Sequence, residues 1–290
     1  MNSLKYCLTS IIAGLCLAIS VNAKAQDSFV FTAIPDQDES QLRERFDKVA
    51  VYLSNQLGVD VKYIPVKSYA AAVTAFRNNQ VQLAWFGGLS GVRARSLVAG
   101  SEAIAQGFED QSFETYFIAH ASTGLQASPD FPQAIAGKTF TFGSKGSTSG
   151  RLMPEYYIRQ QFNKAPEDVF SKVGFSGNHS KTIALVQSGA YEVGAVNFQV
   201  WNKELADGKI DLDKVSVIWT TPAYPDYQWT IRGDVDQRWS AGFKQRVTDA
   251  LLGMKDADLL ASFPRSRFIP ASNGDYLPIL KVAQEIKLID

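Results

Sequence analysis

The 290-residue sequence predicts an α/β protein with two lobes. From Phe29 onward, short apolar runs alternate with segments of helical periodicity, and strands separated by helices of about ten or more residues form βαβ units with parallel sheets. Extended segments near residues 120–123 and 220–226 interrupt the alternation twice. We therefore expect residues 26–120 and 221–290 to form lobe 1, and residues 121–220 to form lobe 2.

The strands are predicted from short apolar runs bounded by turn residues, such as the run that Gly87 and Gly88 end. The helices are predicted from apolar residues at helical spacing, with Pro154 tolerable only in a first turn. Strands are expected at 28–34, 59–65, 81–86, 114–121, 138–143, 173–175, 192–196 and 215–220, and helices at 42–57, 69–78, 149–162, 180–188, 198–205, 237–255 and 275–285.

Residues 1–25 have the pattern of a secretory signal peptide. Lys5 precedes a mostly apolar stretch, and Ala23-Lys24-Ala25 places small residues at a cleavage site before Gln26. A membrane anchor is the alternative, but the apolar run is short for a span of about 20 residues. We therefore expect an exported protein of the periplasm.

Composition excludes several classes of function. Both cysteines, Cys7 and Cys16, lie within residues 1–25, so the exported chain would have no disulfide and no thiolate metal site. Cleavage after residue 25 would remove Lys5 and Lys24 from the 29 basic residues, so 27 basic residues would remain against 29 acidic residues. An exported chain with a net charge near −2 has no basic surface field that would attract nucleic acid or an anionic membrane. Any bound anion must be held by local geometry.

The most informative local pattern is the segment 143–150, Gly-Ser-Lys-Gly-Ser-Thr-Ser-Gly, which follows a predicted strand and opens a predicted helix. Glycines let the backbone approach a ligand, and the start of a helix offers free N–H groups and a positive dipole end. Ser147, Thr148 and Ser149 add three hydroxyl donors. The pattern indicates an oxyanion site, although a flexible turn with an ordinary helix cap is the alternative.

Enzymatic interpretations of this segment are weaker. No Gly-Lys-Ser/Thr closes it, so it is not a phosphate-binding loop of the nucleotide-binding type. A serine hydrolase would need a nucleophile elbow, but the central residue of 146–150 is Thr148. Only His120 and His179 could serve as a base, and two histidines without clustered carboxylates give no metal site. We expect no enzyme, no metal and no cofactor.

Aromatic residues gather near predicted strand ends, and most of them are expected in the core; they are Trp85, Phe86, Tyr116, Tyr224, Tyr227 and Trp229. Tyrosine hydroxyls can still donate to a buried anion. Tyr69, at the beginning of a predicted helix, is the one expected to face a cleft.

Four segments together resemble the periplasmic phosphonate and phosphite binding proteins of ABC transporters. They are 66–69 (VKSY), 84–90 (AWFGGLS), 146–154 (GSTSGRLMP) and 217–222 (VIWTTP), and the resemblance extends from about Phe29 to Pro270. It implies a type II periplasmic binding fold, with two α/β lobes, two hinge strands and a ligand in the cleft. Carried over by position, the family's ligand contacts are Tyr69, Tyr116, Ser147, Thr148, Ser149, His179 and Asp226.

One position departs from the pattern of family members that take up aminoethylphosphonate. Those members have a carboxylate after the strand at 192–196 to pair the ligand amine, whereas the matching residue here is Gln199. A neutral amide cannot neutralise a buried ammonium group. The sequence therefore predicts weak binding of aminophosphonates and favours phosphite, methylphosphonate or a related small anion.

Asp226 bears on the same choice, because a carboxylate repels an anion unless a proton lies between them. A protonated phosphite or phosphonate can donate to Asp226, but sulfate or selenate cannot. If Asp226 faces elsewhere, selenate and other oxyanions such as phosphate return as candidates. The expected function is capture of a small phosphorus oxyanion by a monomer that serves an ABC permease. A ligand sensor of a signalling system and a serine-type hydrolase are the alternatives.

Overall fold

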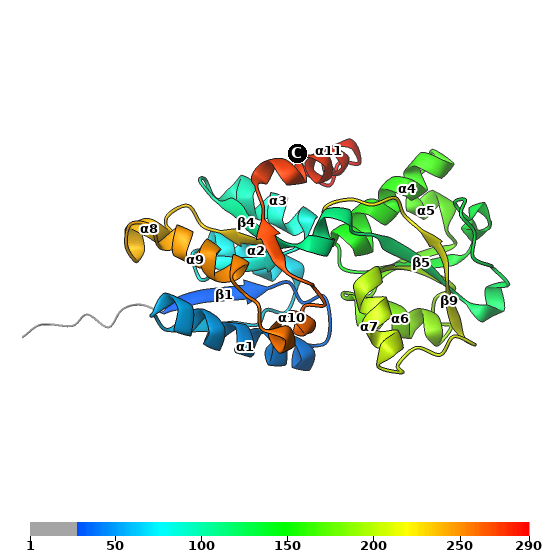
Figure 1. The fold of residues 1–290 in the computed structure, drawn as a ribbon. Coiled ribbons are helices and arrows are strands. Elements are labelled where there is room, and N and C mark those ends of the chain that lie inside the picture. Colours follow the sequence, from blue (N-terminus) through cyan, green and yellow to red (C-terminus); the bar gives the residue numbers. More distant parts are fainter. Residues whose placement is uncertain (1–27, 290) are drawn as a thin grey trace, which may run out of the picture.

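The computed structural model describes residues 28–289 and shows two α/β lobes, each built on its own sheet (Figure 1). The predicted signal peptide lies outside these residues. Within 28–289, no helix is both long and apolar enough to span a bilayer.

Lobe 1 contains a six-stranded sheet between two groups of helices. The strands in spatial order are β11 (Phe268–Pro270), β4 (Glu102–Gly107), β10 (Gln228–Ile231), β3 (Leu83–Phe86), β1 (Phe29–Ala33) and β2 (Val61–Tyr63). The helices are α1 (Glu39–Leu57), α2 (Tyr69–Arg77), α3 (Gly88–Leu97), α8 (Val235–Arg238), α9 (Phe243–Leu252), α10 (Ala257–Ser262) and α11 (Leu277–Glu285), with single turns η1 (Phe108–Ser112) and η5 (Asn273–Tyr276).

Alternation along the strands places side chains on both faces of this sheet. In β3, Phe86 packs on Phe76 of α2 at a ring distance of 5.7 Å, and Trp85 packs on Phe263 at the end of α10 at 5.5 Å. Both faces of the sheet are therefore covered, which explains why β3 is apolar at every position.

Lobe 2 is a five-stranded sheet with two helices on each face. Its strands in spatial order are β7 (Lys172–Phe175), β6 (Thr139–Phe142), β8 (Val193–Asn197), β5 (Thr115–His120) and β9 (Val215–Thr220). The other elements are α4 (Met153–Phe162), α5 (Pro166–Val169), α6 (His179–Gln187) and α7 (Phe198–Ala206), with turns η2 (Ala121–Thr123), η3 (Gln133–Ile135) and η4 (Thr148–Leu152). Phe117 of β5 joins the α4–α5 side of the core, and Ile118 joins the α6–α7 side.

The chain crosses between the lobes twice, and the two crossings pair with each other. Phe113 and Tyr224 exchange backbone hydrogen bonds of 2.8 and 2.9 Å, and Asp226 N donates to Asp110 O at 3.0 Å. Because β5 lies in the sheet of lobe 2, the predicted first boundary after residue 120 is wrong by one strand, and the crossing precedes Thr115.

Two further expectations are corrected. The sheets are mixed rather than parallel, because β5 runs antiparallel to β8 and β9, and β10 runs antiparallel to β3 and β4. These strands lead into or out of the crossings, so they do not belong to simple βαβ units. The predicted helix at 237–255 is split into α8 and α9, where Gly242 has a positive φ of 78°.

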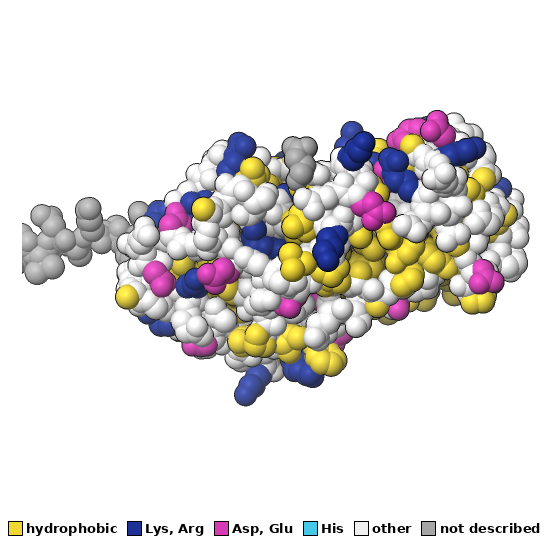
Figure 2. Space-filling model, turned by 90° about the horizontal axis from the view of Figure 1, so that it is seen from above, with side chains coloured by type: hydrophobic (Ala, Val, Ile, Leu, Met, Phe, Trp, Pro, Cys, Tyr) yellow, Lys and Arg dark blue, Asp and Glu magenta, His cyan; other side chains and the backbone are white. Residues whose placement is uncertain are grey.

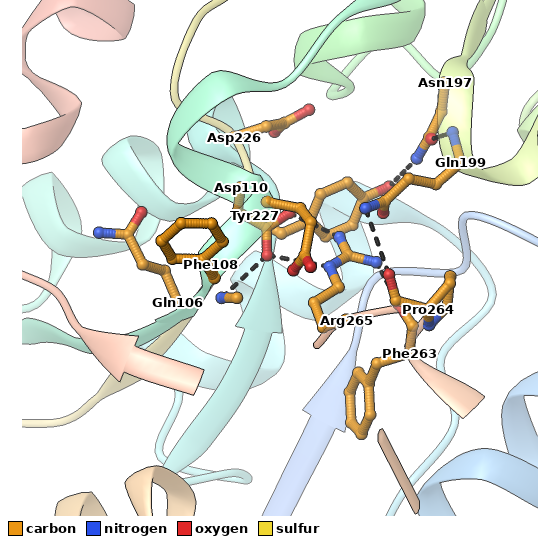
Figure 3. Close-up of polar contacts among 12 residues, drawn as sticks. Gln106, Phe108, Asp110, Asn197, Gln199, Asp226, Tyr227, Phe263, Pro264 and Arg265 are labelled. Atoms are coloured by element: carbon orange, nitrogen blue, oxygen red, sulfur yellow. Dashed lines mark hydrogen bonds and ion pairs between the residues drawn. The ribbon is translucent and has the colours of Figure 1, made fainter. Parts of the chain in front are cut away.

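A buried ion pair anchors the crossings from the side of lobe 1 (Figure 3). Arg265 donates from Nε and Nη2 to the two carboxylate oxygens of Asp110, at 3.0 and 2.6 Å. Burial raises the pKa of Asp110, and the charge of Arg265 opposes that rise. The guanidinium also lies 5.1 Å from the ring centre of Tyr227.

Replacing Asp110 with alanine should lower the free energy of unfolding by about 3–5 kcal/mol, because Arg265 would remain buried without its counter-charge. Denaturant unfolding of the ligand-free protein measures the effect. Glu102→Ala is the matched control: it breaks the exposed 2.7 Å pair with Lys244 and should cost less than about 1 kcal/mol. Equal losses in the two variants would contradict the anchoring role.

Candidate functional site

The Ser-Thr-Ser segment forms a wide turn that presents its hydroxyls at the junction of the lobes. Ser147 caps the turn, with its Oγ accepting from Gly150 N at 2.9 Å, and Leu152 N donates to Ser147 O, five residues back, at 3.0 Å. Turns of this π type are frequent at functional sites. The predicted helix from residue 149 is therefore η4 followed by α4, and all three hydroxyl residues are at most 3% exposed.

A glycine lets the opposing lobe approach this turn. A Cβ on Gly146 would lie 3.0 Å from Cβ of Tyr69, across the boundary between the lobes. A side chain at residue 146 would push α2 away from the turn.

His179, the first residue of α6, is fully buried beside the turn. Its Nδ1 accepts from Asn197 N at 3.2 Å, and burial lowers the pKa of the ring to about 3. The ring is therefore neutral, and the bond at Nδ1 places the single proton on Nε2. Nε2 has no partner among the described residues, so it is a free donor.

Tyr69, at the start of α2, faces the turn from lobe 1. Its hydroxyl lies near the side chains of Ser147 and Tyr227, yet it makes no hydrogen bond of normal geometry with a described residue. Burial raises the pKa of this phenol well above its ordinary value. Tyr69 therefore remains protonated and able to donate.

Asp226 follows the second crossing and is 1% exposed. Its Oδ1 accepts from Gly88 N at 2.8 Å, while Oδ2 has no partner among the described residues. Burial raises the pKa of Asp226 to about 7, although hydrogen bonds from Thr148 and Gly88 oppose the rise. The carboxyl group can therefore gain or lose a proton near neutral pH.

Three residues that the sequence did not single out for the site form a hydrogen-bonded chain between the lobes. Asn197 Nδ2 donates to the Tyr227 hydroxyl at 3.0 Å (Figure 3), and that hydroxyl donates to Asp36 Oδ2 at 2.9 Å. Burial raises the pKa of Asp36, and the charge of Arg45 opposes the rise. Asp36 follows β1 without any local motif, and Tyr227 had been expected in the core.

Five buried polar atoms without a described partner belong to residues at the junction of the lobes. They are Asp36 Oδ1, Tyr69 Oη, Ser149 Oγ, His179 Nε2 and Asp226 Oδ2. Leaving a buried polar group unpaired costs about 1–3 kcal/mol. Three of the groups can donate and two can accept, so the arrangement suits a small ligand that has several oxygen atoms and at least one acidic hydrogen.

Gln199 and Tyr116 have contacts of another kind. Gln199 Nε2 donates to Pro264 O at 3.4 Å (Figure 3). The Gln199 side chain also borders a space of about 10 Å³ beside Asp36, roughly the size of one water molecule. The Tyr116 ring packs near Phe198 at 6.1 Å on the α6–α7 side, and none of the hydrogen bonds described links it to the five atoms.

The residues 28–289 contain no group of three metal-ligating side chains close enough to hold a metal ion. The surface charges are scattered. In the face shown in Figure 2, basic and acidic side chains are interspersed over both lobes.

Comparison with known proteins decides the family. Residues 31–276 match the model of the ABC transporter phosphonate periplasmic substrate-binding proteins. The chain belongs to this family. It is 39% identical over 264 residues to the probable ABC transporter phosphite binding protein PhnD1 of Prochlorococcus marinus, and the aligned region covers 89% of each chain.

Solved structures of family members have the same fold. The structure of that P. marinus PhnD1 in complex with methylphosphonate matches with a TM-score of 0.87, covering 90% of this chain and 99% of the other. A binding protein of a Pseudomonas aeruginosa phosphonate ABC transporter matches with a TM-score of 0.79 at 23% identity, covering 90% and 87%. The predicted two-lobe type II fold is confirmed, and these relatives are transport components rather than enzymes.

The neutral ring of His179 gives a direct test of the site geometry. In ¹⁵N spectra, its Nε2 should stay protonated and its Nδ1 unprotonated from pH 5 to 8, because the pKa is near 3. A spectrum of His179→Gln assigns the signals against those of His120. Titration of the His179 signals near pH 6.5, the ordinary value, would contradict the buried geometry.

Proposed function

We propose that this chain captures phosphite, methylphosphonate or a similar small phosphonate between its lobes and delivers it to the permease of an ABC importer. The observation that carries the proposal is the buried set of three donors and two acceptors contributed by both lobes. The P. marinus relative, which is described as phosphite binding and is solved with methylphosphonate, supports the same ligand class.

The chemistry of the ligand matches four of these five groups. Tyr69, Ser149 and His179 would donate to the unprotonated oxygens of a tetrahedral anion, and the Ser147 hydroxyl can add its hydrogen. Asp226 would accept from a P–OH group, since its Oδ2 has no other partner. Sulfate and selenate have no such hydrogen at neutral pH, so only the protonated form of Asp226 could hold them, and its carboxylate form would repel them.

The same geometry supports binding without turnover. A serine hydrolase needs a histidine nitrogen free to accept the serine proton. Here Nδ1 of His179 is occupied by Asn197 N–H, and Nε2 already carries a hydrogen. His179 therefore cannot act as the base of a histidine-dependent triad with Ser147 or Ser149.

The space around Gln199 supports rejection of aminoethylphosphonate. In this structure the space beside Gln199 and Asp36, about 10 Å³, is smaller than an aminoethyl group, and the neutral amide of Gln199 could not neutralise an ammonium group there. Gln199 also spans to Pro264 of lobe 1, so admitting a longer ligand would break a contact between the lobes.

The family is periplasmic, and we propose that residues 1–25 direct export of a monomer to that compartment. The partner would be an ABC permease that distinguishes the closed, loaded form from the open form.

A thermal-shift panel tests the function. Phosphite and methylphosphonate should raise the melting temperature of the exported protein through mass action, whereas aminoethylphosphonate, sulfate and selenate should do so weakly. Ser149→Ala should weaken phosphite binding about 10- to 100-fold, because a hydrogen bond to a charged group is lost. Ser144→Ala, in the same loop but partly exposed, is the control and should stay within about twofold. The proposal is overturned if no phosphorus oxyanion stabilises the protein.

Binding should depend on pH through Asp226. Above about pH 7, both Asp226 and the ligand lose their protons, so forming the complex requires uptake of one proton, and affinity should fall by up to about tenfold per pH unit. Asp226→Asn should flatten this dependence, since the amide keeps an acceptor for Gly88 N–H and can donate to a dianion. Asp36, Tyr69 and His179 are unchanged in this variant, so the difference isolates Asp226. Calorimetry over pH 6–9 measures both slopes, and equal slopes would refute the proton-sharing model.

A further inference from the structure

The Thr148 hydroxyl is engaged with the opposite lobe rather than left free for a ligand. Its Oγ1 accepts from Leu89 N, in the first turn of α3, at 3.0 Å. It also lies close enough to Asp226 to lower the pKa of that carboxyl group. The Thr148 hydroxyl therefore makes a contact between the lobes that is present whichever ligand is bound.

We propose that Thr148 is a positioning residue that fastens the closed form and does not take part in choosing among ligands. This inference rests on the function proposed above. It separates Thr148 from the neighbouring Ser147 and Ser149, although the resemblance to the family implied the same role for all three.

The other side of this contact is built to receive Thr148. Asp226 Oδ1 accepts from Gly88 N at 2.8 Å, next to Leu89, whose N–H donates to the Thr148 hydroxyl. A Cβ on Gly87 would lie 3.0 Å from Asp226 Oδ1 and 3.3 Å from Thr148 Oγ1. The absence of a side chain at Gly87 thus leaves the room that this clamp, formed by Thr148, Gly88, Leu89 and Asp226, requires.

Ser149 provides the contrast within the same turn. Its carbonyl accepts from the Thr115 hydroxyl at 2.9 Å, a contact within lobe 2, while its own hydroxyl has no described partner. Ser149 is therefore anchored through its backbone and free at its hydroxyl, whereas Thr148 is engaged at its hydroxyl.

A clamp of this kind changes affinity in a recognisable way. The apparent affinity of a ligand scales with the fraction of protein that can reach the closed form. Weakening the clamp lowers that fraction by the same factor for every ligand, so the ratio of affinities between two ligands stays constant. Removing a ligand contact instead changes the ratio when the ligands differ at that contact.

The experiment compares Thr148→Val, Thr148→Ser and Ser149→Ala by calorimetry and stopped-flow dissociation, with phosphite and methylphosphonate as probes. Thr148→Val should weaken both ligands by the same factor, about tenfold, with faster dissociation, because Leu89 N–H loses its acceptor. Thr148→Ser should restore both affinities to within about twofold of the wild type. Small-angle scattering at saturating phosphite should show the same compaction in all of these proteins.

Gly87→Ala disturbs the clamp from the side of lobe 1 and should also weaken the binding of both ligands by the same factor. This variant serves as the test if Thr148→Val does not fold. Unchanged affinity in Thr148→Val, or a shift of more than about threefold in the ratio of the two ligands, overturns the inference. Failure of the wild-type protein to bind either ligand would instead overturn the proposed function.

Discussion

The structure depends on one constraint: polar groups buried between the lobes need hydrogen-bond partners to replace the water that closure of the lobes removes. In an open form, Tyr69, His179 and the two carboxylates would be hydrated, but closure removes that hydration. Asn197, Tyr227 and Asp36 satisfy part of the need through hydrogen bonds between the lobes. The remaining unpaired atoms need a ligand of the right donor pattern, so closure and binding are coupled through a cost of desolvation.

The fold holds these groups in register by linking the lobes at a few fixed points. Backbone pairing of Phe113 with Tyr224 joins the two crossings to each other, and the ion pair of Asp110 with Arg265 holds the crossings to lobe 1. On the side of lobe 2, Leu152 and Met153 pack into the core of lobe 1 directly after the Ser-Thr-Ser turn. The Ser-Thr-Ser turn is therefore attached to both lobes, so a small displacement of the turn would also displace the residues at the junction of the lobes.

The sequence predicted the site better where the signal was local. The composition of the glycine-flanked Ser-Thr-Ser segment and of the turn before α6 is distinctive, and the structure places His179 beside Gly150 and Ser147. Asp36 has no local signal, because its role arises only when β1 of lobe 1 meets α6 of lobe 2, where His179 N donates to Asp36 O at 3.0 Å. The elements α3, β4 and β10 were missed for different reasons. Helix α3 contains Gly88 and Gly91 without an apolar stripe, β4 has Ile104 as its one β-branched residue, and β10 has four residues.

The proposed donors are uncharged, and this limits the charge that the ligand can carry. Tyrosine, serine and neutral histidine supply dipoles, while Arg265 pairs with Asp110, and Arg45 donates to Gln37 and acts on Asp36 through its charge. Neutral dipoles stabilise one negative charge in a buried site far more readily than two. A dianion beside Asp226 would add repulsion without compensation, so a singly protonated phosphite or phosphonate is the form that fits. Selection by proton content then lies with Asp226, while Thr148 sets how firmly the closed form is held.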